Sequence, residues 1–250
     1  MRFNKMKFYI WNETHLGDII MALNSIYSRN IELGIKFEIY GPSEINYLLD
    51  FFDYQGLIYK DLCNIEVRHM KNSLSSLFPI AITKKLDYGF TYFTSCNLFS
   101  TEDDCGYISK VYFPKPKQKI YPENVIYFQF DSRSVVERKK KFSTRRIHEF
   151  IADNTKFFDG EILGIGGLDT IQYTDKYPLI IGNLNKTLHC LAGSCKFIGI
   201  DSGMSHIAGM LGLPGEILVC FDEYKCFCEV EAVYSMYPNL NCYFRGYKFL

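Results

Sequence analysis

Short apolar runs alternate with amphipathic segments along the first part of the chain. The apolar runs at 7–11 and 36–41 have the length of strands. Each is followed by a segment, 17–29 and 44–52, whose apolar residues recur three or four positions apart, which predicts a helix. Strands that alternate with helices are typical of parallel sheets with right-handed crossovers, so we expect an α/β fold.

The pattern weakens between residues 60 and 115, where 81–83 and 88–93 are short candidate strands. The segment 113–124, "FPKPKQKIYPEN", then combines three prolines with three lysines. Proline-rich composition interrupts both helices and strands. We therefore expect a domain boundary here, with an N-terminal domain over 1–115 and a C-terminal domain over 116–250.

The alternation resumes after this boundary, so the two halves are both expected to be α/β units. Ser143 is the expected N-cap of one helix, and Ile147, Phe150 and Ile151 form its core-facing side. The predicted strands are 125–130, 161–167, 179–182, 196–200 and 216–221, and the predicted helices are 143–154, 186–193 and 203–211.

Composition narrows the class of protein. The chain has 250 residues, is 48% hydrophobic, and has a formal net charge of zero from 28 basic and 28 acidic residues. Such a chain can bury a substantial core, and its overall charge does not require a polyanionic partner. No apolar run approaches the length of a membrane span, and the first apolar stretch is too short for a signal peptide. We expect a cytoplasmic protein with reduced thiols.

The nine cysteines have no regular spacing. Zinc sites commonly use paired C-x2-4-C units, and the cluster near the C-terminus instead has one C-x-C and one C-x4-C. The densest group consists of Cys190, Cys195, Cys220, Cys226 and Cys228. We therefore expect no metal site.

Ligands of open parallel sheets bind beyond the carboxyl ends of the strands, where helix N-termini provide N–H groups suited to phosphate. The first strand-to-helix corner, "NETHLGD" (12–18), has Gly17, which allows close approach, and Asp18 in the first helical turn. Asp18 can complement the helix dipole or act as a general base. Both roles need it at a helix start, so its position does not separate them.

A second corner, 130–146, is strongly basic. Its cations are Arg133, Arg138, Lys139, Lys140, Lys141, Arg145 and Arg146. A run of charge can be a solvated face, but this one comes directly after a buried-looking strand, where Arg and Lys can hold a diphosphate without a metal.

The third corner is "GIDSGMSHIAGMLGLPG" (199–215). Ser202 and Ser205 can offer hydroxyls to a phosphate, and His206 can donate to a phosphate or a ribose from the first helical turn. A simple N-cap explains Asp201 or Ser202, but not both together with His206. A glycine turn at 164–170 adds Asp169 as a candidate for ribose hydroxyls.

Taken in order, these elements resemble glycosyltransferase family 9, the heptosyltransferase type. The stretches that carry the resemblance are "HLGDII" (15–20), "FDSRSVVERKKKFS" (130–143), "GIGGLD" (164–169) and "DSGMSHIAGMLGLP" (201–214). The last matches every fixed position of the family pattern D-[ST]-G-x-x-H-x-A-x-x-L-G-x-P. The resemblance extends over about 120–221 and around 7–29, whereas the sequence after Pro214 departs from the family.

The resemblance implies an α/β fold of the GT-B type, with two Rossmann-like domains whose parallel sheets face each other across a cleft. The N-terminal domain would bind the acceptor, and the C-terminal domain the nucleotide-sugar donor. Asp18 matches the catalytic base, Lys140 the lysine on the donor diphosphate, and Asp169 the ribose-binding acid. The donor-binding residues would be Gly17, Ser132, Arg133, Lys140, Asp169, Asp201, Ser202, Gly203 and His206.

The implied activity is inverting, metal-independent transfer of a sugar from a nucleotide-diphosphate donor to an acceptor hydroxyl, without a cofactor. By analogy the acceptor is a saccharide such as lipopolysaccharide core, and peripheral membrane contact is compatible with this. Three alternatives stay open: transfer to hydroxylated bases of DNA, permitted by the basic stretches 115–119 and 138–146; a non-catalytic nucleotide-sugar-binding module; and a relative that epimerises or phosphorolyses sugars.

Overall fold

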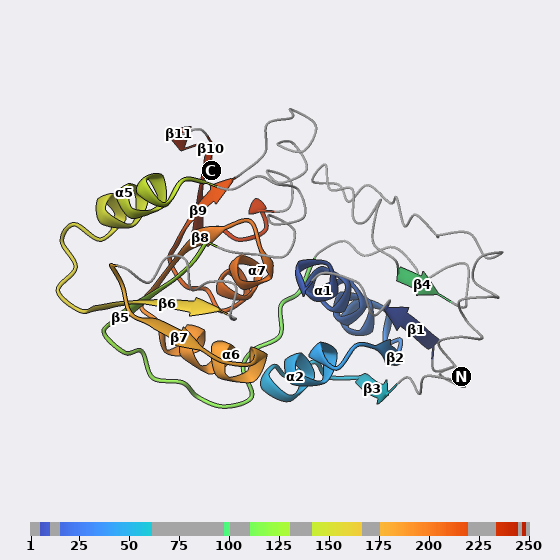
Figure 1. The fold of residues 1–250 in the computed structure, drawn as a ribbon. Helices are drawn as coiled ribbons and strands as arrows, with labels where there is room; N and C mark the ends of the chain where they lie inside the picture. The colour runs from blue at the N-terminus through green and yellow to red at the C-terminus, as the bar shows by residue number, and fades with distance from the viewer. Residues whose placement is uncertain are drawn as a thin grey trace. The chain divides into compact units, whose positions relative to one another are not determined.

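A computed structural model describes residues 6–10, 16–61, 98–100, 111–130, 142–166, 176–219, 234–244 and 247–248. The chain divides into two compact units, Met1–Lys117 and Gln118–Leu250, each with its own sheet (Figure 1). The candidate strands at 81–83 and 88–93 lie outside the described residues.

The first unit has a four-stranded sheet in the order β3-β2-β1-β4. Its elements are β1 (Met6–Ile10), α1 (Leu16–Leu33), β2 (Phe37–Gly41), α2 (Glu44–Phe51), β3 (Leu57–Asp61) and β4 (Leu98–Ser100). The first three strands are parallel, and β4 is antiparallel to β1. Ile19, Leu23 and Ile26 of α1 are buried, as the helical spacing in the sequence predicts.

The start of the proline-rich segment belongs to this first unit. The Asp53 N–H donates to the Lys115 carbonyl at 2.8 Å, and the Lys117 N–H donates to the Phe51 carbonyl at 2.9 Å. These bonds flank an isolated antiparallel bridge between Phe52 and Pro116. Because Pro116 has no N–H, the bridge relies on the lysines beside it. The first unit therefore ends two residues later than composition suggested.

The second unit has a seven-stranded sheet in the order β11-β10-β9-β8-β5-β6-β7. The strands are β5 (Val125–Gln129), β6 (Glu161–Gly166), β7 (Leu179–Ile181), β8 (Lys196–Ile200), β9 (Gly215–Val219), β10 (Leu240–Phe244) and β11 (Tyr247–Lys248). All neighbours are parallel except β10 and β11. From β5 the chain adds two strands on one side and then returns to add β8, β9 and β10 on the other. This is the strand order of a Rossmann fold.

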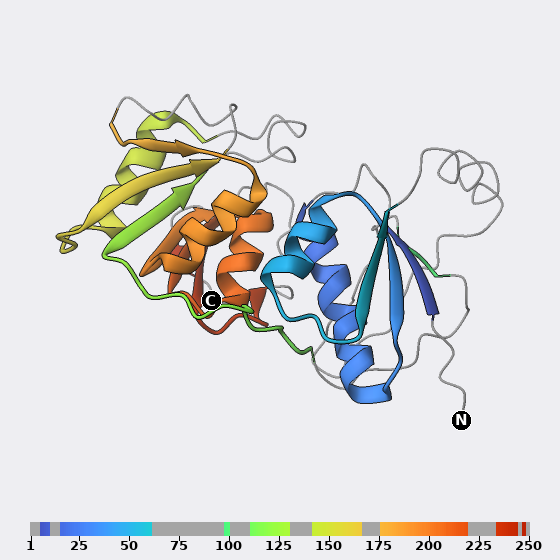
Figure 2. The same cartoon turned by 90° about the horizontal axis from the view of Figure 1, so that it is seen from below.

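Three described helices cover the two faces of this sheet, as Figures 1 and 2 show. They are α5 (Thr144–Asn154), α6 (Leu184–Gly193) and α7 (Gly203–Met210). Ile147 and Ile151 of α5 pack on one face against alternate strand residues such as Phe128 and Ile198. Helices α6 and α7 contact each other and lie on the opposite face, against β5, β8 and β9. A parallel sheet covered on both faces confirms the expected α/β fold class.

Most predicted elements after the boundary are confirmed to within a few residues. The Ser143 side chain accepts a hydrogen bond from the Arg146 N–H at 3.3 Å, which confirms the N-cap of α5. Sequence reasoning did not identify β3, β4, β10 or β11. β4 and β11 have only three and two residues, and β3 (LIYKD) and β10 (LNCYF) combine apolar residues with polar ones, so no clear apolar run marks them.

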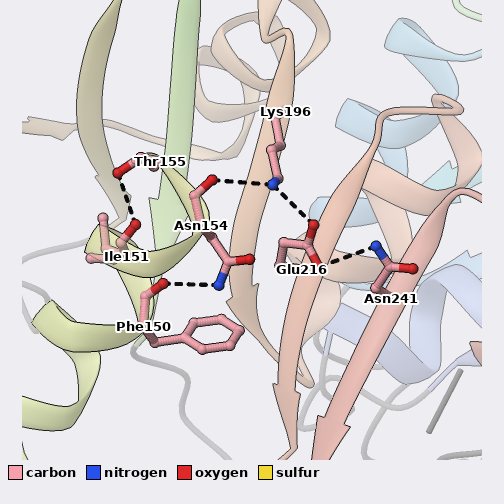
Figure 3. A network of polar contacts seen from close by, with 7 residues as sticks. All are labelled: Phe150, Ile151, Asn154, Thr155, Lys196, Glu216 and Asn241. Carbon is pink, nitrogen blue, oxygen red and sulfur yellow. Dashed lines mark hydrogen bonds and ion pairs between the residues drawn. The ribbon is translucent and has the colours of Figure 1, made fainter. Parts of the chain in front are cut away.

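A partly buried polar network ties the amino ends of β8, β9 and β10 to the end of α5 (Figure 3). Lys196 Nζ lies 2.9 Å from Glu216 Oε1 and donates to the Asn154 carbonyl at 3.3 Å. The Asn241 amide donates to Glu216 Oε2 at 3.1 Å. Because a cation at a helix C-terminus complements its dipole, Lys196 anchors α5 as well as pairing with Glu216. The network lies at the amino ends of these strands, away from the carboxyl ends where ligands of such sheets bind.

Candidate functional site

The direction of sheet growth reverses between β5 and β8. These strands are parallel neighbours, with Ile126 opposite Lys196 and Gln129 opposite Gly199. Their carboxyl ends therefore lie side by side, and the next described helices, α5 and α7, lie on opposite faces of the sheet. Ligands of open α/β sheets bind in the crevice outside such a reversal point. Asp201, Ser202 and Gly203 form the "DSG" corner. This corner comes directly after β8, so the fold places it at the reversal point between β5 and β8.

A hydrogen bond joins the two strand ends at this point. Ser202 Oγ donates to Gln129 Oε1 at 3.3 Å. Ser202 is the N-cap of α7 in an extended conformation, yet within the described part of the chain its side chain makes no cap hydrogen bond. Gln129 was not among the residues expected from sequence. The sequence signal that could have identified Gln129 is a side-chain amide at the end of a predicted strand, just before a basic segment.

The first N–H groups of α7 face the reversal point without a cap from Ser202. The N–H groups of Ser205 and His206 bond to the Ser202 carbonyl at 3.1 and 3.3 Å. Those of Gly203 and Met204 precede these first intrahelical bonds, as at any helix start. Together with the positive end of the helix dipole, they form an arrangement suited to an anion.

The Asp201 carboxylate accepts a hydrogen bond from a tyrosine of the C-terminal segment. Tyr234 is 1% exposed, and its hydroxyl donates to Asp201 Oδ1 at 2.8 Å. Burial, and next the charge of Asp201, raise the pKa of Tyr234 well above its usual value. The phenol therefore keeps its proton and fixes the orientation of the half-buried carboxylate.

His206 is buried among tyrosines rather than exposed at the corner. Its side chain is 4% exposed, and its ring stacks on Tyr234 with centroids 5.3 Å apart. Its Nδ1 lies 3.3 Å from the Tyr237 hydroxyl. Burial lowers the pKa of His206 to about 4, so the imidazole is neutral at pH 7. Its expected contact with a phosphate or ribose stays a prediction, while its described contacts shape the corner.

Ser205 is also turned inward. It is fully buried, and its hydroxyl donates to the Ile200 carbonyl at the end of β8. The prediction that Ser205 offers a hydroxyl to a phosphate is therefore wrong. Ser205 lies about one helical turn beyond the end of β8, so its hydroxyl can reach back to the last carbonyl of that strand.

The glycines in the second half of the motif have structural reasons. A Cβ at Gly209 would lie 2.4 Å from the Tyr237 ring. Gly212 has φ 71°, and its N–H donates to the Gly209 carbonyl at 3.1 Å. The Leu213 N–H donates to the Ala208 carbonyl at 3.1 Å, which completes a Schellman motif. These positions set where α7 packs and ends.

The other predicted site residues are only partly described. Gly17 and Asp18 lie in the first turn of α1, where the sequence placed them. Ser132, Arg133, Lys140 and Asp169 lie outside the described residues.

The described end of the basic corner lies on the surface. Arg145 Nε is 2.8 Å from Glu149 Oε1, and both side chains are exposed. The Arg146 guanidinium lies over the Phe142 ring, 5.3 Å from its centroid. This part of the basic run is therefore a solvated helix face, as one of the two interpretations proposed.

Two features are absent from the described residues. The described part of the chain contains no group of three or more His, Cys, Asp or Glu residues that could hold a metal ion. Of the described helices, none combines the length and the apolar character needed to cross a bilayer. Cys190, Cys195 and Cys242 are free thiols.

Comparison with known proteins gives structural matches. No family model matches the chain, and no curated protein matches its sequence. The solved structure of E. coli ADP-heptose lps heptosyltransferase II matches with a TM-score of 0.60 at 10% identity, over 94% of this chain and 89% of that chain.

Two further solved structures give similar matches. A glycosyl transferase family 9 protein from Veillonella parvula matches with a TM-score of 0.53 at 13% identity, over 87% of this chain and 81% of that one. E. coli heptosyltransferase WaaC with ADP-2-deoxy-2-fluoro heptose matches with a TM-score of 0.51 at 12% identity, over 88% and 90%. At these identities the likeness concerns the fold. The chain therefore shares its α/β fold with these heptosyltransferase and glycosyl transferase family 9 structures, as its motifs predicted.

Proposed function

We propose that this protein is a glycosyltransferase that moves a sugar from a nucleoside-diphosphate donor to an acceptor hydroxyl. One observation carries the proposal: the "DSG" corner lies at the reversal point of a Rossmann-type sheet, where Ser202 bonds across to Gln129 instead of capping α7. That corner offers helix N–H groups to an anion. The fold shared with heptosyltransferases makes a nucleotide-sugar diphosphate the first candidate for this anion.

In this proposal the second unit provides all the assigned donor-binding residues except Gly17, which belongs to the first unit. The N–H groups of Gly203 and Met204 donate to the diphosphate, and Lys140 and Arg133 contribute positive charge. Asp201 and Asp169 accept from donor hydroxyls. Ser132 and Gly17 complete the assigned donor residues, and His206 supports the corner from inside. The roles of Gly17, Ser132, Arg133, Lys140 and Asp169 rest on the motif resemblance.

The chemistry is set by where charge develops. As the glycosidic bond to the diphosphate breaks, the sugar gains oxocarbenium character and negative charge grows on the leaving diphosphate. The helix dipole of α7 and the basic side chains stabilise that charge, and removal of one such contact typically lowers the rate ~100- to 1000-fold. Asp18 accepts the proton of the acceptor hydroxyl as its oxygen attacks. Attack on the face opposite the leaving group inverts the anomeric centre, and no metal is required.

ADP-heptose is the first donor to test, because the proteins named above include an ADP-heptose lps heptosyltransferase and a heptosyltransferase with a fluorinated ADP-heptose. By analogy with the lps heptosyltransferase we propose a saccharide acceptor such as lipopolysaccharide core, and a cytoplasmic location with peripheral membrane contact fits this proposal. Transfer to hydroxylated DNA bases is the alternative acceptor chemistry. Exposed Lys115, Lys117 and Lys119 favour testing it.

A panel of nucleotide sugars, measured by thermal shift with and without EDTA, tests the proposal. A true donor at 100 times its Kd stabilises the folded protein by about 2.7 kcal/mol. Gln129→Leu is expected to reduce this stabilisation, whereas the matched control Gln55→Leu, at an exposed residue of the first unit, leaves it unchanged. If no nucleotide sugar stabilises the protein, the proposal fails, and if EDTA abolishes binding or turnover, the metal-independent mechanism fails.

The acceptor class needs a second experiment. Release of nucleoside diphosphate is followed with a lipopolysaccharide-core saccharide and with DNA containing hydroxymethylated bases. Acceptor-dependent release with the saccharide supports the first assignment, and release only with DNA, falling steeply as salt rises, replaces it. Donor binding without any release identifies a non-catalytic module, and donor turnover without an acceptor identifies the epimerising or phosphorolytic alternative.

A further inference from the structure

We infer that Tyr234 and Tyr237 are positioning residues that hold the donor corner in its binding geometry. This inference rests on the proposed function and adds to it two side chains outside the motif. We call the segment 234–239 the tyrosine clamp. It directly precedes β10, and its own backbone is ordered by bonds from the Tyr237 N–H to the Tyr234 carbonyl at 2.9 Å and from the Leu240 N–H to the Tyr237 carbonyl at 3.0 Å.

The clamp contacts α7 along its whole length. At the N-terminal end Tyr234 donates to Asp201 Oδ1 at 2.8 Å. Near the C-terminal end, at the last residue but one of α7, the Tyr237 ring occupies the space beside Gly209 that a Cβ would fill. At the C-terminal end the Asn239 amide donates to the Leu213 carbonyl and, at 3.4 Å, to the Ala208 carbonyl. One short segment therefore fixes both the entry and the exit of the helix.

Both tyrosine hydroxyls point at residues of the donor motif. The Tyr237 hydroxyl lies 3.3 Å from His206 Nδ1, while the Tyr234 ring stacks on the His206 ring with an angle of 15° between planes. Each tyrosine is 1% exposed. A buried hydroxyl is unfavourable unless it is hydrogen-bonded, so phenylalanine would serve better if the clamp only filled space. The hydroxyls are therefore assigned to orienting Asp201 and His206.

This arrangement explains how the corner can be ready for an anion before the anion arrives. Helix N–H groups stabilise a diphosphate well only if they already point at it, because reorganisation on binding lowers affinity. Ser202 and Gln129 fix the corner on the side of β5, and the clamp fixes it on the side of β10. The corner is held between contacts from two different strands.

Calorimetric titration with ADP tests the inference. Tyr234→Phe is expected to weaken ADP binding about tenfold, since displacement of a binding group by a fraction of an ångström has effects of this order. The matched control is Tyr127→Phe: Tyr127 is a buried tyrosine of β5 whose hydroxyl contacts Cys190, away from the corner. The control binds ADP as the unmodified protein does. Equal binding by the two variants overturns the inference.

An epistasis experiment shows whether Tyr234 acts through Asp201. Tyr234→Phe should weaken ADP binding in the unmodified protein but not further in an Asp201→Ala background. Asp201→Asn, which keeps an acceptor oxygen for Tyr234, provides a second background in which Tyr234→Phe still has an effect. If the losses of Tyr234→Phe and Asp201→Ala multiply instead, Tyr234 does not act through Asp201 and the inference is wrong.

A ligand-free measurement separates failure of the clamp from failure of the proposed function. If the unmodified protein binds neither ADP nor any nucleotide sugar, the proposed function fails. The clamp is still tested by urea unfolding of the same variants without ligand. If the two residues are coupled, the changes in the urea midpoint caused by Tyr234→Phe and Asp201→Ala should not add. Additive shifts show that the two residues are not coupled and overturn the clamp.

Discussion

The two strand-to-helix corners that carry the motifs differ in the helix that each one starts. After β1, helix α1 continues for 18 residues and has buried polar residues from its middle onward, Asn24, Ser25, Ser28 and Arg29. After β8, helix α7 has eight residues, and all but the first of them are buried. The first helix is long and partly polar inside, and the second is short and enclosed.

The two helices are also anchored differently. Within α1, Ser28 Oγ donates to the Asn24 carbonyl at 2.7 Å, and Arg29 donates to the Ser25 carbonyl at 3.1 Å, both one turn back. Two of these residues also have distant partners, since Tyr54 donates to Asn24 and the Tyr112 N–H donates to Ser28. At the donor corner, Asp201 before α7 and His206 within it are held by one segment about 30 positions later in the chain. The comparison teaches that α1 combines contacts one turn back with distant ones, whereas the donor corner depends on the tyrosine clamp.

The largest expected effect is the loss of turnover when Asp18, at the first strand-to-helix corner, is replaced. Asp18→Asn should lower turnover ~100- to 10,000-fold, because the variant removes the general base, and should leave donor binding intact. The measurement is acceptor-dependent release of nucleoside diphosphate. Asp50→Asn, at an exposed aspartate of α2, is the control and should retain activity. Unchanged turnover in Asp18→Asn would remove Asp18 from the mechanism.

The second prediction concerns the pH dependence that His206 gives to the other corner. Its pKa is about 4 in the folded protein against an ordinary 6.5, so between these values the unfolded chain binds a proton that the folded one does not. The contribution of His206 to stability is therefore present above pH 6.5 and is lost as pH falls toward 4, by up to about 3 kcal/mol.

Urea unfolding of His206→Phe across pH measures this contribution. The stability difference between the unmodified protein and the variant should shrink as pH falls from 6.5 to 4. It should stay constant between pH 7 and 8, where histidine is neutral in both states. A difference that is independent of pH down to 4 would show that His206 is not buried as described.

Gly209→Ala tests the packing of the tyrosine clamp against α7. The new methyl group would overlap the Tyr237 ring, which should lower the free energy of unfolding by about 1–3 kcal/mol and weaken ADP binding. At Gly212 a Cβ would meet no described atom within 4 Å, but φ is 71°. Gly212→Ala should therefore lower stability by about 1–2 kcal/mol with little change in ADP binding. Equal loss of ADP binding in the two variants would contradict the clamp.

The smallest expected effect returns to the first unit. The Tyr54 hydroxyl donates to Asn24 Oδ1 at 2.9 Å, and Tyr54→Phe should lower stability by about 1 kcal/mol. ADP binding should not change, because all the assigned donor-binding residues except Gly17 belong to the second unit. Tyr47→Phe, at an exposed tyrosine of α2, should be nearly neutral. Weaker ADP binding in Tyr54→Phe would show that the first unit contributes more to donor binding than Gly17 alone.

Much of the fold was predictable because the signals are local. Apolar periodicity located α1, α2, α5 and the central strands, and Ser143 marked the start of α5. Glycine and proline at the end of the "DSG" motif marked the end of α7, where Gly212 has a positive φ. β4, β10 and β11 were missed because none is a continuous apolar run, so each depends on pairing with a neighbouring strand for its definition.

The sequence by itself determined the order of the helices and of the central strands, the position of the polar corners and the motif that resembles family 9. These depend on backbone preferences and on residues a few positions apart. Only the tertiary structure decided that His206 meets Tyr237, that Gln129 meets Ser202, and that Tyr234 reaches Asp201. The physical reason is that these partners lie far apart along the chain, and strand order alone brings them together. β5 lies beside β8, and β10 beside β9.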